Sequence, residues 1–311
     1  MNFKTRLNKK QHKPLAPIIT GMISHKFSYE EIRNALNLPF ESLEQYAMFV
    51  SDVYFTEMGV LDNLTFNLQY EKIDTKLKKL LLEKLTYPLF LFVLSFMLTL
   101  FFNQKFAPSI LNMLKDYQIE KLSLNIIYGF SSLLKFLWIL VLIIFVVISL
   151  LLSQKDFRYL VYIRFHNFKF MKTVRNILTL RFSLVYVFLL KRKYTTQDFF
   201  KQIKKSTGIE DVKWLGYLVY EKITQGEPIT EALDHAFFNP YFILYFKKGF
   251  YNQDISKSLD EYIDILEMMI TQEISQIVTL VKACIYTYIF IFIGIYYVFL
   301  FQPLSIMEVF I

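Results

Sequence analysis

The chain has 311 residues, of which 54% are hydrophobic and 18% aromatic, with only eight glycines and eight prolines. This composition argues against a turn-rich sheet protein and favours helices. The formal charge of +8 accompanies long apolar runs, so it favours contact with an anionic membrane surface over contact with nucleic acid. The single cysteine, Cys284, excludes an intramolecular disulfide and a cysteine metal cluster, and we expect it to be a small buried hydrophobe.

The first 84 residues are mostly polar and predict a short cytoplasmic helical domain. No apolar core with a small-residue cleavage site follows the basic start, so the N-terminus is expected to stay on the side of synthesis. Ser28 and Glu31 have the capping-box spacing and predict a helix that runs to about Leu36. A second helix is predicted over residues 41–57, and a longer amphipathic helix from about Asp62 leads into the first apolar run.

Three apolar runs predict three transmembrane helices, at residues 85–104, 130–154 and 283–303. Each contains close to the ~20 residues that a helix needs to cross a bilayer. The residues between the first two runs, 105–129, predict an external connection, and residues 304–311 an external tail. Prolines at positions 108 and 303 suggest that the first and last spans end near them.

Residues 155–282 predict a second cytoplasmic helical domain, with helices near 195–205, 212–224 and 230–237. The apolar piece 182–190 is too short to span a bilayer and predicts a buried core helix. Gly208 predicts a break, and residues 226–228 a turn. From Ile255 a long amphipathic helix continues without a breaker into the last apolar run.

Basic residues predict the topology. The region 1–84 carries twelve Lys or Arg, the connection 105–129 three, the region 155–282 nineteen and the tail none. Cytoplasmic loops are enriched in Lys and Arg, so both polar domains are predicted inside, the N-terminus cytoplasmic and the C-terminus external. The predicted location is therefore the cytoplasmic membrane, as a multi-pass protein.

The two polar regions resemble each other in order and spacing. Residues 23–39 match residues 223–240 with a difference of one residue, and residues 60–64 match residues 255–259. In both copies an amphipathic helix then leads into a predicted span. Chance similarity among helices is the alternative, and duplication accounts better for the shared order.

No constellation of residues indicates an enzyme. The four histidines are scattered, and no phosphate-binding glycine loop or nucleophile elbow occurs. The sequence therefore predicts no catalytic residues, no cofactor and no metal. Few ionisable residues lie within the predicted spans, which disfavours a transport pathway. Acidic residues near the start of the last long helix lie opposite its apolar stripe; a solvated face is the first interpretation, and a docking surface for a basic partner is the second.

This arrangement resembles the inner-membrane platform family of type II secretion systems and type IV pili (GspF/PilC), in its Gram-positive competence (ComGB-like) branch. The local matches are Tyr87-Pro88 at the first span, Pro108 after it, the segment 246–259 and Gln302-Pro303-Leu304. The family pattern is approximately G-E-x-x-G-x-L-x-x-x-L. Gly249, Ile255 and Leu259 match it, as do Val60 and Leu64 in the first copy. Phe250 and Gln253 depart from it, and Tyr54-Phe55 replace Gly-Glu in the first copy.

The resemblance implies an all-α polytopic membrane protein with three transmembrane helices and two related cytoplasmic helical-bundle domains. It implies a non-enzymatic platform that couples a cytoplasmic assembly ATPase to polymerisation of pilin-like subunits and supports DNA uptake, without touching nucleic acid. The expected partners are that ATPase, pilin-like subunits, the lipid bilayer and further copies of the chain. A non-catalytic subunit of another transport complex is the alternative. The candidate partner contacts are Gly249, Asp254, Asp260, Glu261, Asp264 and Glu267.

Overall fold

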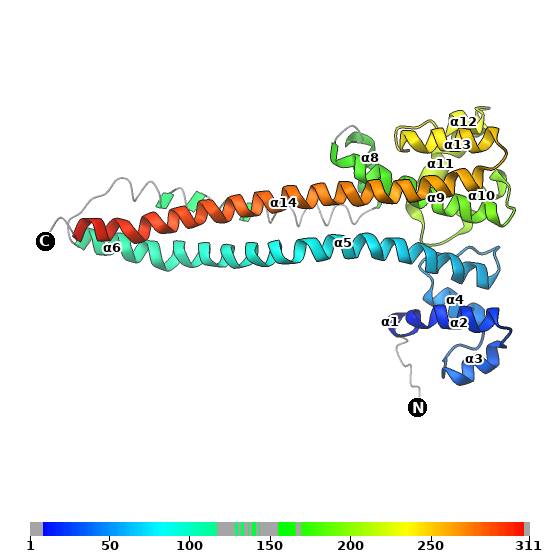
Figure 1. The fold of residues 1–311 in the computed structure, drawn as a ribbon, viewed down its shortest axis with the longest axis horizontal. Helices are drawn as coiled ribbons and strands as arrows, with labels where there is room; N and C mark the ends of the chain where they lie inside the picture. Colours follow the sequence, from blue (N-terminus) through cyan, green and yellow to red (C-terminus); the bar gives the residue numbers. More distant parts are fainter. Residues whose placement is uncertain are drawn as a thin grey trace. The chain divides into compact units, whose positions relative to one another are not determined.

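The computed structural model describes residues 9–116, 155–165 and 169–307, with a few single positions between 128 and 143. The regular elements in these ranges are all helices (Figure 1). They are α1 (Lys9–His12), η1 (Lys13–Leu15), α2 (Ala16–Ser24), α3 (Tyr29–Ala35), α4 (Leu43–Val50), α5 (Val60–Phe101), the π-helical turn η2 (Phe102–Phe106), α6 (Ala107–Asp116), α8 (Lys155–Phe165), α9 (Lys169–Lys191), α10 (Thr196–Lys205), α11 (Glu210–Thr224), α12 (Ile229–Ala232), α13 (Pro240–Tyr251) and α14 (Ile255–Met307).

The chain divides into two compact units. Unit 1 contains Met1–Lys78 and His166–Thr271, and unit 2 contains Lys79–Phe165 and Gln272–Ile311. The two predicted cytoplasmic segments therefore pack into one unit, and their division into two related domains stays a prediction. The helices α5 and α14 each contribute their first part to unit 1 and their later part to unit 2.

In the part of the chain that the structure describes, three helical stretches are long and apolar enough to cross a membrane: Val60–Asn112, Met171–Lys191 and Ile255–Val298. The most apolar part of the second is 67% buried inside the protein, against 22% for each of the others. This stretch, α9, contains the predicted buried core helix 182–190 and packs within unit 1. Length and composition thus support a multi-pass membrane protein. The predicted span at 130–154 lies almost wholly outside the described residues.

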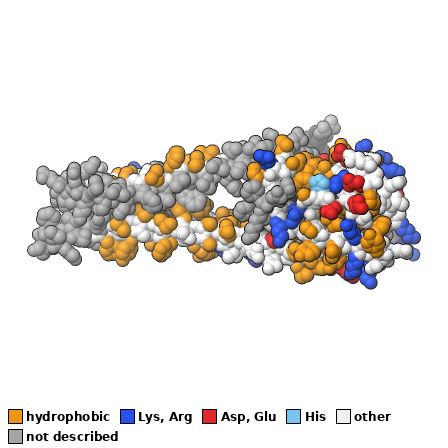
Figure 2. Space-filling model, turned by 90° about the horizontal axis from the view of Figure 1, so that it is seen from above, with side chains coloured by type: hydrophobic (Ala, Val, Ile, Leu, Met, Phe, Trp, Pro, Cys, Tyr) orange, Lys and Arg blue, Asp and Glu red, His pale blue; other side chains and the backbone are white. Residues whose placement is uncertain are grey.

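The exposed surfaces of the two units differ in chemistry. On the face shown in Figure 2, charged side chains gather over unit 1, whereas hydrophobic side chains are prominent along the long helices of unit 2. Phe90 is 63% exposed on α5, and Phe290 is 78% exposed on α14. Large apolar side chains that are this exposed over a long stretch match a hydrocarbon environment better than water.

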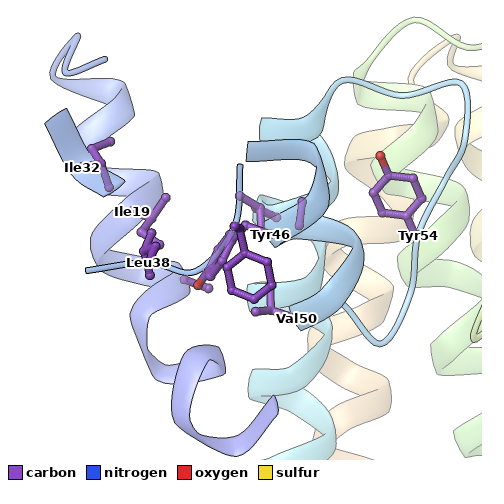
Figure 3. Close-up of a cluster of buried hydrophobic side chains, with 10 residues drawn as sticks. Ile19, Ile32, Leu38, Tyr46, Val50 and Tyr54 are labelled. Carbon is purple, nitrogen blue, oxygen red and sulfur yellow. The ribbon is translucent and has the colours of Figure 1, made fainter. Parts of the chain in front are cut away.

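The first helices of unit 1 form a small core of their own. Ile19 of α2, Ile32 of α3 and Leu38 pack with Tyr46 and Val50 of α4 (Figure 3). The predicted capping box at the start of α3 is confirmed, since Ser28 Oγ accepts a hydrogen bond from the Glu31 amide and the Glu31 carboxylate accepts one from the Ser28 amide. Local capping and apolar periodicity thus agree in fixing this short segment.

Aromatic rings fill the second core of unit 1. Phe182 of α9 lies edge-on to Phe199 of α10 and to Phe238, with ring centroids 5.3 Å and 4.9 Å apart. Phe242 of α13 contacts Tyr262 of α14 at 5.8 Å. Edge-to-face and tilted pairs at these distances are favourable, so the rings hold α9, α10, α13 and α14 together.

Several predicted helix ends differ from the structure. The helix predicted over 41–57 ends at Val50, because the following backbone is held by side chains of α5 that are described below. The helix predicted over 230–237 is the shorter α12. Neither long helix stops at its proline: α14 includes Pro303, and the π-helical turn η2 leads into α6, which contains Pro108. A π-helical turn disrupts the regular i→i−4 bonding pattern, which eases a following proline.

The turn after α2 and the turn after α11 have the same local geometry. The amide of Phe27 donates to Met22 O at 3.1 Å, and the amide of Glu227 donates to Lys222 O at 3.1 Å. The residue inside each turn has a positive φ, 68° at Lys26 and 96° at Gly226. Both are Schellman caps in matching positions of the two segments that the sequence pairs.

We predict opposite effects for alanine at two glycines. Gly226→Ala should lower the stability of unit 1 by about 1 kcal/mol, because φ of 96° is unfavourable for a residue with a Cβ. Gly21→Ala should raise it by up to about 1 kcal/mol, because Gly21 lies inside α2 with open space around it. Thermal unfolding of the detergent-solubilised protein, followed by circular dichroism, measures both. A lower unfolding temperature for Gly21→Ala would contradict the assignment.

Candidate functional site

Two buried asparagines of α5 hold the extended segment that follows α4. The Asn67 Oδ1 accepts hydrogen bonds from the amides of Asp52 and Val53 at 3.0 and 2.9 Å, and its Nδ2 donates to Val53 O. The Asn63 Oδ1 accepts from the Phe55 amide at 2.7 Å, and its Nδ2 donates to the carbonyl oxygens of Phe55, Met58 and Gly59. These amides replace the backbone partners that a helix or sheet would supply, so residues 51–59 have a fixed conformation without regular secondary structure.

The segment held by these asparagines contacts the second half of unit 1. Tyr54 exchanges two backbone hydrogen bonds with Thr207, at 3.3 and 2.9 Å, as an isolated antiparallel bridge. At the next residue, Gly208, the backbone approaches so closely that a Cβ would lie 1.7 Å from Asp52 O. The predicted break at Gly208 is therefore confirmed, and it has a second purpose: only glycine permits this close approach.

Charged side chains surround this backbone contact. Glu57 accepts hydrogen bonds from Lys205 and from Gln202 of α10. The hydrogen bond and positive charge of Lys205 hold the pKa of the Glu57 carboxyl below its usual range. At Asp52, burial alone would raise the pKa, but hydrogen bonds from Lys13 and Lys9 outweigh it and lower the pKa.

Further ion pairs join α5 to the other helices of unit 1. Arg181 of α9 lies 3.2 Å from Asp74 of α5 and 3.0 Å from Asp211 of α11, so one guanidinium binds two carboxylates. Lys76 of α5 lies 2.8 Å from Glu267 of α14. Since a guanidinium holds its donors in a rigid fork, the Arg181 pairs fix α5 relative to α9 and α11 within this unit. We call the set of contacts from Asn63, Asn67, Tyr54, Glu57 and Arg181 the clamp.

The structure places most of the predicted acidic contacts in ion pairs within unit 1. Asp260 pairs with Lys191 at 2.6 Å, Glu261 with Lys248 at 3.8 Å, and Glu267 with Lys76 at 2.8 Å. Asp264 is exposed on α14 between them. The carboxylates thus lie along one stretch of α14, as predicted, and three of them already serve intramolecular pairing. Their role in binding a partner stays a prediction.

The remaining two candidates fix the turn before α14. Asp254 accepts a hydrogen bond from the Lys257 amide at 3.1 Å and so caps the first turn of α14. Gly249 is buried, and a Cβ there would lie 2.7 Å from Ile255 Cα and 2.9 Å from Ser258 Cβ. Gly249 therefore allows α13 and α14 to pack backbone against backbone, which gives its match to the family pattern a physical reason.

In unit 2 the later parts of α5 and α14 run parallel. The hydroxyls of Thr99 and Tyr288 share a hydrogen bond at 2.6 Å, and Lys84 Nζ donates to Ser275 Oγ at 2.7 Å. These partners are 189 and 191 positions apart, and the stacked pair Phe106–Tyr296 is 190 apart. A nearly constant offset along the helices shows that they point the same way and keep one register.

The clamp and the parallel pair of α5 and α14 consist of hydrogen bonds, ion pairs and ring contacts that hold helices against one another. Among the described residues, no group of three or more His, Cys, Asp or Glu could hold a metal ion. Cys284, which we expected to be buried, is exposed on α14, because the neighbouring positions Ala283 and Cys284 lie on a helix face that no described residue covers.

The sequence reasoning missed Asn63 and Asn67, although a signal for them exists. They stand four positions apart beside the apolar stripe of a predicted helix, which places two amides on the face that meets the core. Asparagine is uncommon in helix interiors unless its side chain has backbone partners.

Comparison with family models, with curated proteins and with solved structures finds no match for this chain.

We predict that Asn67→Leu destabilises unit 1 by at least about 2 kcal/mol, because the buried amides of Asp52 and Val53 lose their acceptor. The segment 51–59 should then become a substrate for chymotrypsin at Tyr54 and Phe55, which are buried in the native protein. Mass spectrometry of the fragments identifies the cut. The matched control Asn34→Leu, at an exposed position of α3, should stay within about 0.5 kcal/mol and resist cleavage there. Equal resistance of both variants would refute the assigned role of Asn67.

We also predict an acid-dependent loss of stability. The carboxyl of Glu57 has a lowered pKa in the folded protein, so its stabilising effect is complete above the unfolded value of about 4.3 and is lost as the pH falls through the lower folded value. The unfolding temperature should therefore fall below about pH 4, and Glu57→Gln should make this acid step smaller. The control Glu30→Gln, an exposed glutamate of α3, should leave the step unchanged. An identical pH profile for Glu57→Gln would contradict this.

Proposed function

We propose that this protein is a non-enzymatic membrane platform of the type II secretion and type IV pilus kind, which couples a cytoplasmic assembly ATPase to polymerisation of pilin-like subunits and supports DNA uptake. The observation that carries the proposal is the pair α5 and α14: each begins in the clamped unit 1 and continues without an assigned break into the apolar unit 2. The resemblance of the sequence to the platform family supplies the partners.

The clamp supports a role in force transmission. Asn63, Asn67 and the Arg181 pairs lie on the part of α5 that precedes its apolar run. Ser258 at the start of α14 donates to Tyr245 O at 2.7 Å, and Leu259 beside it is fully buried. A displacement of unit 1 by a partner would therefore move the first turns of both helices, because both are fastened to its core.

The acidic stretch of α14 is the proposed contact for the ATPase, with Asp264 as its exposed carboxylate and Asp260 and Glu261 as carboxylates in half-exposed pairs. A basic partner surface exchanges such pairs at little cost, since ion pairs at exposed positions contribute only about 0–1 kcal/mol each. Further copies of the chain and the pilin-like subunits would contact the exposed apolar faces of unit 2.

The alternative is a non-catalytic subunit of another transport complex. The observation that favours this second function is a row of buried polar side chains in an apolar stretch, Ser95 and Thr99 of α5 and Asn103 of η2. The hydroxyls of Ser95 and Thr99 and the amide of Asn103, however, bond to backbone carbonyls one turn before them or to Tyr288, which is the pattern of a helix contact more than of a solute pathway.

We predict that insertion of two glycines after Lys282 abolishes filament assembly while membrane insertion and ATPase binding remain. Two glycines inside α14 weaken the helix and rotate the residues beyond them, so motion of unit 1 no longer reaches unit 2 in register. Co-purification with the assembly ATPase measures binding, and electron microscopy of cells measures filaments.

The matched control is the same insertion after Gly226, in the turn between α11 and α12, where the chain already bends. This variant should assemble filaments. Normal filaments from the insertion after Lys282 would refute coupling through α14. Strong binding to a permease, together with no binding to any assembly ATPase, would favour the alternative function.

A further inference from the structure

The register between α5 and α14 determines how deep each side chain of unit 2 lies in a membrane (Figure 1). Partners along the two parallel helices are 189 to 191 positions apart, from Lys84–Ser275 through Thr99–Tyr288. Phe102 packs against Phe292 with the same offset. Lys282 of α14 therefore lies level with Phe92 of α5.

This level is inside the apolar run of α5. The run begins at Leu85, seven residues before Phe92, and each residue of a helix rises 1.5 Å. Lys282 thus lies about 10 Å deeper than the start of the first span. If each apolar run is considered alone, Lys84 and Lys282 both lie at the edge of the membrane. If the two helices are aligned by their register, Lys282 lies at the depth of the hydrocarbon.

The described residues near Lys282 provide apolar surroundings. Tyr286, four positions after Lys282 and so on the same side of α14, is 45% exposed, and Phe290 one turn further is 78% exposed, so this side faces a medium that takes apolar side chains. Lys282 itself is partly exposed on the same stretch. A lysine in such a place reaches for the headgroup region, or brings headgroups and water towards itself.

The described residues of α5 and α14 provide no carboxylate at this depth. In the sequence no acidic residue occurs between Glu273 and Glu308, and none occurs between Glu83 and Asp116. The apolar stretch 136–154 contains no acidic residue either. Glu273 stands nine residues before Lys282, about 13 Å along the helix axis, which is beyond the reach of an ion pair.

We propose that Lys282 binds the phosphate of an anionic phospholipid from the cytoplasmic leaflet and draws the membrane surface inward beside α14. A lipid-facing lysine has no counter-charge of its own. The lipid phosphate neutralises its ammonium group, and an acidic lipid does so without leaving a second charge unpaired. The bilayer is then locally thinner next to α14 than next to the exposed side of α5. The inference requires membrane insertion and does not depend on an ATPase or on pilins.

Cys284 is a native probe of the membrane surface at this level, because it is the sole cysteine, it is exposed, and it lies about 3 Å beyond Lys282 along the axis of α14. The full chain is reconstituted into phosphatidylcholine vesicles with and without phosphatidylglycerol, and a membrane-impermeant maleimide labels the thiol. Labelling of Asn34→Cys in a Cys284→Ser background gives the fraction of molecules whose unit 1 faces outward. Circular dichroism confirms equal helix content in each variant.

In vesicles with phosphatidylglycerol, Lys282→Leu should slow labelling of Cys284 by about fivefold or more, and Lys282→Arg should restore it. Wild-type labelling should be slower by a similar factor without the acidic lipid. The matched control Lys79→Leu, at an exposed position before the start of the span where a lysine needs no inward headgroup, should stay within about twofold of wild type.

Equal labelling of wild type and Lys282→Leu overturns the proposal. An unreactive Cys284 in both vesicle types overturns it as well, because the membrane surface then does not reach this level in either lipid. Since the assay contains neither ATPase nor pilin, these failures would leave the platform function untouched, and failure of ATPase binding would leave this result untouched.

Discussion

The side-chain amides of Asn63 and Asn67 are the constraint on which unit 1 depends. They bond the backbone of residues 51–59, which has no partners in a helix or sheet of its own. In this segment, the backbone of Tyr54 forms the antiparallel bridge to Thr207, and the carbonyl oxygen of Asp52 lies against Gly208. Without the two amides, the small core around Ile19 and Tyr46 would lose the fixed position of Tyr54, which is one of its members, and its attachment to α10.

Much of the helical architecture follows from local signals in the sequence. The capping boxes at Ser28 and Thr195, the break at Gly208 and the unbroken stripe from Leu259 to Ile274 each depend on residues within a few positions of one another. The end of α4 at Val50 was not predictable in this way. It depends on Asn67, which reaches back fifteen positions to the Asp52 amide, and helix periodicity contains no information about such a partner.

The candidate site shows the same division between local and long-range information. The sequence predicted acidic residues along one stretch of α14, and the structure agrees. The sequence could not predict that Lys191, Lys248 and Lys76, from three other helices, pair with these residues. Gly249 is the reverse case. A pattern match singled it out, and the structure supplies the reason, since Ile255 and Ser258 leave no room for a Cβ.

Depth in a membrane is likewise a property of helix pairs. In a hydropathy profile, Lys282 is the last charged residue before an apolar run, and the profile therefore places it at the boundary between membrane and water. The bond between Thr99 and Tyr288 fixes the offset of α14 against α5, and this offset moves Lys282 inward relative to Leu85. Because the clamp fastens α5, and Ser258 and the ion pairs of Asp260 and Glu267 fasten α14, neither helix can slide to bring its lysine to the other's boundary. In the proposed insertion the lipid accommodates this mismatch, and the proposed platform would then meet the transmembrane segments of other subunits where the bilayer is already disturbed.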